Sequence, residues 1–123
     1  VDNNLGRLLA FLEERNIDDN TILIFLSDNG GYALNGLYNA GMRGGKSRLY
    51  EGGHRVPCFI RWPNKHIGGP DQGRDEEGLT QVQDIFATVL DACDEDHSKL
   101  GAIECDGLSL LPALLNESEL PSR

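Results

Sequence analysis

The chain has 123 residues, of which 39% are hydrophobic and 25% are charged, which is ordinary for one folded domain. Its formal net charge of −9 and the absence of a dense Lys/Arg run argue against a nucleic-acid-binding protein. The longest apolar runs have five residues, whereas a membrane-spanning helix needs about 20.

The first third of the chain predicts a helix followed by a buried strand. Four leucines recur with helical spacing, and they should pack this helix on a sheet: Leu5, Leu8, Leu9 and Leu12. Asn3 or Asn4 is the expected helix cap. The apolar run from Ile22 to Leu26 predicts a strand buried on both faces, as in a parallel sheet covered by helices.

Two metal-ligand candidates, Asp28 and Asn29, follow this strand within a loop at 27–31. Ligands of parallel sheets bind beyond the carboxyl ends of the strands. Carboxylate and carboxamide oxygens suit Ca²⁺ or Mg²⁺ better than Zn²⁺, and Ca²⁺ takes about six to eight oxygens, so these residues supply part of a shell. Alone, the Asp-Asn-Gly-Gly sequence is equally typical of an ordinary turn.

A glycine-rich loop comes next, and its part at 43–53 is the candidate anion-binding loop. Residues 30–53 contain eight glycines and little apolar periodicity, which predicts a long irregular loop. Gly44 and Gly45 allow close backbone approach and can direct N–H groups toward an anion, while Lys46 adds an ammonium suited to a tetrahedral oxyanion. Arg43 adds a second cation. Alone, Arg-Gly-Gly-Lys is also typical of a solvated loop.

Three further charged residues of this region have separate interpretations. Arg48, taken alone, is interpreted as solvated. His54 is a candidate donor to a substrate, although a histidine beside a strand is more often structural. Glu51 is expected to pair with a nearby cation rather than to act as a catalyst: Arg43, Lys46 or Arg55.

The second half of the chain predicts a strand at 56–62, a polar surface segment at 64–78 and an amphipathic helix at 82–93. This helix has two possible starts, a capping box of Thr80 with Gln83 or a later start capped by Asp84. Residues 106–115 predict a turn and a short apolar helix. The acidic run at 94–97 lacks metal-ligand spacing and is interpreted as solvated.

The three cysteines fit neither a paired disulfide framework nor a CxxC metal site, so free thiols are favoured, with one disulfide and a spare thiol as the alternative: Cys58, Cys93 and Cys105.

Taken together, the motifs resemble those of the sulfatases. The matches are Ser27-Asp28-Asn29-Gly30-Gly31, Arg43-Gly44-Gly45-Lys46 and Tyr50-Glu51-Gly52-Gly53, with further ones between Val1 and Pro112. The resemblance implies an α/β fold, in which residues 1–123 form part of a catalytic domain with an alkaline-phosphatase-like, mostly parallel sheet flanked by helices.

The resemblance also implies roles for individual residues. Asp28 and Asn29 match the family's late metal ligands, with Ca²⁺ preferred to Mg²⁺, and Lys46 matches the catalytic lysine that contacts the substrate sulfate. Arg43 and His54 are further candidates for substrate binding. The expected partner is a sulfate ester, for which a sulfated carbohydrate is one candidate, and the expected location is secreted, periplasmic or lysosomal.

The family nucleophile is a formylglycine made from the first residue of a Cys/Ser-x-Pro-x-Arg motif, and none of the three cysteines begins one. We therefore expect a fragment, with the nucleophile in a missing N-terminal part and no turnover from these residues alone. Two alternatives stay open. One is a phosphate or phosphonate ester hydrolase or transferase of the same fold, against which Asn29 argues because such enzymes often place His there. The other is a non-catalytic, degenerate copy.

Overall fold

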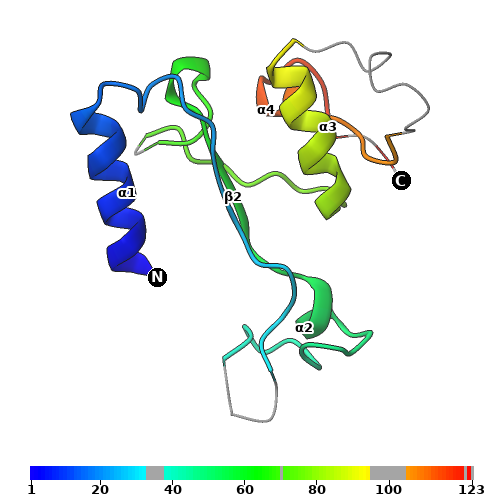
Figure 1. Cartoon of the computed structure of the whole chain (residues 1–123). Helices are drawn as coiled ribbons and strands as arrows, with labels where there is room; N and C mark the ends of the chain where they lie inside the picture. Colours follow the sequence, from blue (N-terminus) through cyan, green and yellow to red (C-terminus); the bar gives the residue numbers. More distant parts are fainter. Residues whose placement is uncertain (33–37, 70, 95–104, 121, 123) are drawn as a thin grey trace. The chain divides into compact units, whose positions relative to one another are not determined.

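The computed structural model describes residues 1–32, 38–69, 71–94, 105–120 and 122 (Figure 1). It divides into two compact units, Val1–Pro63 and Asn64–Arg123, which are described separately. The first unit contains α1 (Asp2–Glu14), β1 (Leu23–Leu26), α2 (Glu51–His54) and β2 (Cys58–Arg61); a 3₁₀ turn, η2 (Pro63–Lys65), follows, and α3 (Val82–Ala92) and α4 (Leu111–Leu114) belong to the second unit. No described helix is both long and apolar enough to cross a bilayer.

Helix α1 forms where the leucine spacing predicts it, but its start and its packing differ from the prediction. Val1 occupies the cap position without a side-chain hydrogen bond, so the expected asparagine cap is wrong. Leu12 is buried, whereas Leu8 remains 42% exposed. The leucine stripe is therefore only partly covered.

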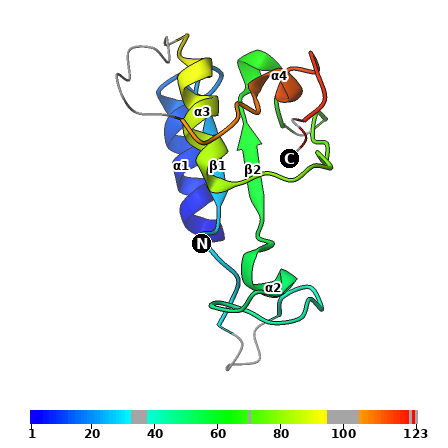
Figure 2. The same ribbon diagram turned by 90° about the vertical axis from the view of Figure 1, so that its right-hand side faces the viewer.

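The two described strands form an antiparallel pair, with Leu23 opposite Arg61 and Leu26 opposite Cys58 (Figure 2). The parallel arrangement is not seen among the described strands, and the expected burial of β1 on both faces is wrong, because Phe25 is 38% exposed. Leu26, the next residue, is also 38% exposed, so both faces of β1 are exposed at its carboxyl end.

At the carboxyl end of β1 the chain leaves the sheet, and it returns at the start of β2. Figure 1 shows the described parts of the intervening segment, including α2, beyond this end of the strand pair. Part of the predicted irregular loop is thus a single helical turn, while its residues 33–37 lie outside the described residues.

The second unit is organised by contacts between α3 and the segment before α4. The fully buried carboxylate of Asp84 accepts the Gln81 N–H at 2.7 Å, which closes the start of α3, and the Leu108 N–H at 2.9 Å. The start of α3 therefore differs from both predicted starts: Gln81 is the cap and Asp84 its capping partner. Thr88 adds a link by accepting the Leu110 N–H at 2.9 Å.

Arg74 lies in the segment predicted as a surface excursion and has a structural role there. One guanidinium nitrogen donates to the carbonyls of Ala113 at 2.9 Å and Leu114 at 2.8 Å, and so holds this segment against the end of α4. Residues 95–97 of the predicted solvated acidic run lie outside the described residues. The three cysteines are free thiols, as favoured from the sequence.

Candidate functional site

The loop at 27–31 is fixed at the carboxyl end of β1 by short-range hydrogen bonds. The Ser27 N–H donates to the Pro57 carbonyl at 3.3 Å, and its Oγ donates to the Asn29 carbonyl at 2.8 Å. The turn therefore lies at the strand end, where the sequence predicts the metal ligands.

Asp28 and Asn29 present their polar groups side by side. The Asn29 amide Nδ2 donates to the Asp28 carboxylate Oδ1 at 3.2 Å, and Asp28 is exposed to solvent. Within the described residues no group of three His, Cys, Asp or Glu side chains could hold a metal ion. A hard cation at these two residues would therefore need oxygens from further groups.

Two backbone hydrogen bonds join this turn to the glycine-rich loop. The Lys46 N–H donates to the Gly31 carbonyl at 2.9 Å, and the Gly30 N–H donates to the Gly53 carbonyl at 3.0 Å. The chain thus brings the backbone of Lys46 next to the loop that carries Asp28, although the two lie 18 positions apart in the sequence.

The glycines of the Tyr-Glu-Gly-Gly motif allow the backbone segments to approach closely. A Cβ on Gly52 would lie 2.6 Å from the Gly44 carbonyl oxygen, and one on Gly53 would lie 2.2 Å from the Arg48 carbonyl oxygen. The Gly52 N–H also donates to the Arg43 carbonyl at 2.9 Å. Any side chain here would force the segments apart.

Lys46 stands at the corner of a tight turn. The Arg48 N–H donates to the Gly45 carbonyl at 3.0 Å, and Ser47 has a left-handed φ of 66°. The Lys46 side chain is exposed and has no hydrogen bond or ion pair within the described part of the chain. Its ammonium is therefore available to a ligand.

Asn39 is a supporting residue that the sequence did not identify. Its amide Nδ2 donates to the Gly44 carbonyl at 2.7 Å and so holds the loop ahead of Lys46. An isolated asparagine in a glycine-rich stretch has no periodic signal that distinguishes it from a turn residue.

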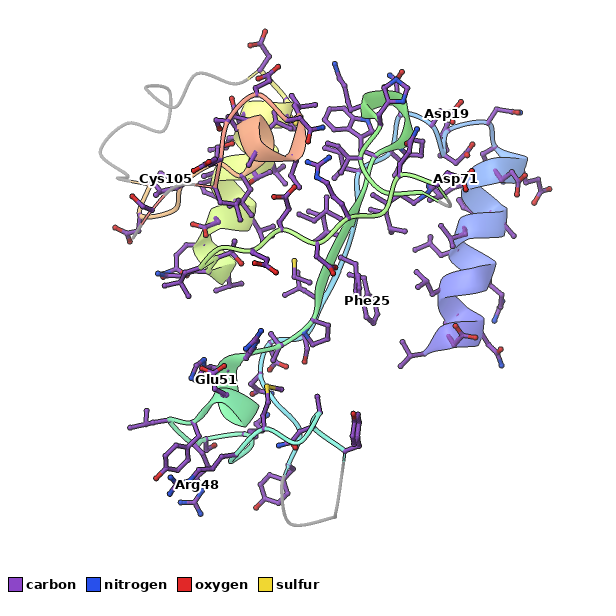
Figure 3. The ribbon with its side chains drawn as sticks, turned by 180° about the vertical axis from the view of Figure 1, so that it is seen from behind. Asp19, Phe25, Arg48, Glu51, Asp71 and Cys105 are labelled. Atoms are coloured by element: carbon purple, nitrogen blue, oxygen red, sulfur yellow. The ribbon has the colours of Figure 1, made fainter. Side chains whose placement is uncertain are left out.

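The remaining predicted residues have distinct surroundings. The Arg43 guanidinium carbon lies 3.7 Å from the centre of the Tyr50 ring. Glu51 pairs with Arg55 at 3.3 Å, which confirms one of its three expected partners. His54 ends α2 with its side chain exposed, and no hydrogen bond or ion pair of the described residues joins this side chain to the turn at 27–31. Figure 3 shows Glu51 beyond the end of the sheet, away from Phe25.

The protein-family model described as Sulfatase matches residues 1–95. The chain belongs to the sulfatase family. It is 34% identical over 119 residues to the N-acetylgalactosamine-6-sulfatase of Canis lupus familiaris, with coverage of 94% of this chain and 22% of the relative. The uncharacterized sulfatase YdeN of Escherichia coli is 35% identical over 120 residues, with coverage of 97% and 20%.

Two solved structures are similar to the fold of this chain as well. The crystal structure of Ps i-CgsB in complex with k-i-k-neocarrahexaose matches with a TM-score of 0.83 and 30% identity, over 97% of this sulfatase chain and 25% of that one. A structure connected with the metabolism of multiple glycosaminoglycans by Bacteroides thetaiotaomicron matches with a TM-score of 0.75 and 32% identity, over 96% and 25%. The chain thus spans about a fifth of the length of the relatives named above.

Proposed function

We propose that the full-length protein hydrolyses sulfuric esters and that this segment supplies metal-binding and sulfate-binding residues. The single observation that supports this most directly is the 2.9 Å hydrogen bond from the Lys46 N–H to the Gly31 carbonyl. It anchors the candidate sulfate-binding lysine beside the turn that carries Asp28 and Asn29. Family membership supplies the class of reaction.

The chemistry of the donors at Asp28 and Asn29 fits part of the shell of a hard divalent cation, with Ca²⁺ preferred to Mg²⁺. Their 3.2 Å contact keeps a carboxylate and an amide together, but it directs the amide nitrogen, not its oxygen, at the carboxylate. Rotation of the Asn29 amide would turn its oxygen toward the same side as the Asp28 carboxylate, and one cation could then bind both side chains. When bound, it would supply positive charge to the oxygens of the substrate sulfate.

Lys46 contributes fixed positive charge in this proposal. Its ammonium donates hydrogen bonds to sulfate oxygens and stabilises the negative charge that accumulates while the bond to the alcohol breaks. Arg43 and His54 bind other parts of the substrate. Formylglycine, which the family resemblance places outside these residues, would supply the attacking oxygen.

A sulfated carbohydrate is the proposed substrate class. One relative is named for N-acetylgalactosamine, and one similar structure is a complex with a neocarrahexaose. Both names refer to a carbohydrate, which is the support for this substrate class. An extracytoplasmic location is proposed on family resemblance alone.

The test uses the full-length protein with N-acetylgalactosamine 6-sulfate and the corresponding 6-phosphate. We expect faster cleavage of the sulfate, loss of activity on chelation, and better recovery with Ca²⁺ than with Mg²⁺. Lys46→Ala should lower kcat by roughly 100-fold or more, as expected for loss of a transition-state-stabilising cation. Arg7→Ala, which removes a charge from the exposed face of α1, is the control.

Two results would contradict this proposal. Faster cleavage of the phosphate ester would favour the phosphoryl-transfer alternative. The absence of cleavage, together with no Ca²⁺ binding that depends on Asp28, would favour a non-catalytic copy.

A further inference from the structure

Three side chains gather around Gly44, two residues before Lys46. A Cβ added to Gly44 would lie 3.0 Å from the Cβ of Tyr50 and 3.2 Å from the Cβ of Arg48, so both residues flank this glycine. The Arg43 guanidinium lies over the Tyr50 ring. Two cations and an aromatic ring thus form one surface feature, which we call the Arg43–Tyr50–Arg48 cluster.

The cluster retains its positive charge, unlike its neighbour Arg55. Glu51 neutralises Arg55 through the 3.3 Å ion pair, whereas neither Arg43 nor Arg48 has a carboxylate partner within the described residues. Arg48 is exposed, and Figure 3 shows it in the segment beyond the end of the sheet. In a chain of net charge −9, this local concentration of cations gives one part of the surface an attraction for anions that the net charge opposes.

We propose that the Arg43–Tyr50–Arg48 cluster binds a second sulfate group of the substrate, on a sugar next to the one whose sulfate ester is placed at Lys46. This inference rests on the proposed function, because that function places the reacting ester at Lys46. Guanidinium groups bind tetrahedral and planar oxyanions through paired N–H donors. The Tyr50 ring, with Arg43 stacked on it, holds one guanidinium in place at little cost in side-chain entropy.

The backbone supports this arrangement on the same turn. Because the Arg48 N–H closes the turn on the Gly45 carbonyl, Arg48 and Lys46 are carried by one four-residue unit. A substrate that engages both would gain affinity from its second sulfate without an extra conformational step. The cluster would then select oligosaccharides with several sulfates over those with one.

The test measures binding to the full-length protein in a Lys46→Ala background, which slows turnover. The probes are a carrageenan hexasaccharide with several sulfate groups and a carrageenan disaccharide with one, titrated by calorimetry. Arg48→Gln should weaken binding of the hexasaccharide about tenfold and change binding of the disaccharide far less. Added salt should shrink this difference, since it screens exposed charges. Arg7→Gln removes the same charge from α1 and should leave the ratio of the two affinities unaltered.

The outcomes separate this inference from the proposed function. An unaltered affinity ratio in Arg48→Gln would overturn the cluster's role, even if the wild-type protein hydrolyses sulfate esters. Conversely, the protein could show an Arg48-dependent preference for the hexasaccharide but cleave no sulfate ester. That result would support anion binding by the cluster and contradict the proposed hydrolase activity.

Discussion

Replacing Gly30 by alanine should separate the two loops of the candidate site. The new Cβ would lie 1.8 Å from the Gly52 carbonyl oxygen, so the backbones must move apart by about 1.5 Å to reach ordinary contact. The movement would also break the 3.0 Å hydrogen bond from the Gly30 N–H to the Gly53 carbonyl. Overpacking costs about 1–3 kcal/mol and the lost hydrogen bond about 1 kcal/mol, so the loops should lose about 2–4 kcal/mol of local stability.

Hydrogen exchange of the Lys46 amide in the full-length protein measures this loss directly, because that amide bonds to the Gly31 carbonyl. We expect its exchange to accelerate roughly 30-fold to several hundredfold, together with a fall in sulfate ester turnover. Gly6→Ala is the control: a Cβ there meets nothing within 4 Å, and alanine should stabilise the exposed part of α1 by about 0.5–1 kcal/mol. Unchanged Lys46 exchange in a folded Gly30→Ala protein would refute the reasoning.

Two further predictions concern single groups. Asp84→Ala should destabilise the second unit by about 3–5 kcal/mol, because two N–H groups lose a buried carboxylate acceptor, whereas Asp84→Asn should cost less. Exchange of the Leu108 amide measures the effect, and equal protection in Asp84→Ala would contradict it. Cys58 is exposed, but partial desolvation by its neighbours raises the pKa of its thiol, so less thiolate is present at neutral pH. Iodoacetamide should therefore label Cys58 more slowly in the native protein than in the urea-unfolded protein. The difference in rate should vanish above the raised pKa, and equal rates at neutral pH would be evidence against this desolvation.

Local patterns were sufficient to predict most elements of the fold. The leucine spacing predicted α1, and the apolar residues from Val82 onward predicted α3, because both patterns depend on a helical period within one segment. The start of α3 was harder to predict. Its cap depends on Asp84, which also accepts a hydrogen bond from Leu108, 24 residues later.

The pairing of the strands was not predictable from local pattern. A short apolar run such as 22–26 fits a strand buried on both faces, but its burial depends on which segments cover it. In the described chain β2 covers one edge of β1, and Phe25 and Phe59 lie with ring centres 6.3 Å apart, both exposed. The sequence therefore identified the strand but not its partner or its faces.

The glycine motifs of the candidate site could be located from the sequence, but the structural reason for each glycine could not. Paired glycines suggested N–H groups directed at an anion, and within the described residues the Gly44 and Gly45 N–H groups have no hydrogen-bond partner that would prevent this. Gly30, Gly52 and Gly53 have another reason to be glycine, since a Cβ on each would meet a carbonyl oxygen within 2.6 Å. The Ser-Asp-Asn-Gly and Tyr-Glu-Gly-Gly motifs therefore act as one packing unit. Their joint occurrence reflects the close approach of two backbones, which in turn fixes the backbone of Lys46 beside the turn that carries Asp28 and Asn29.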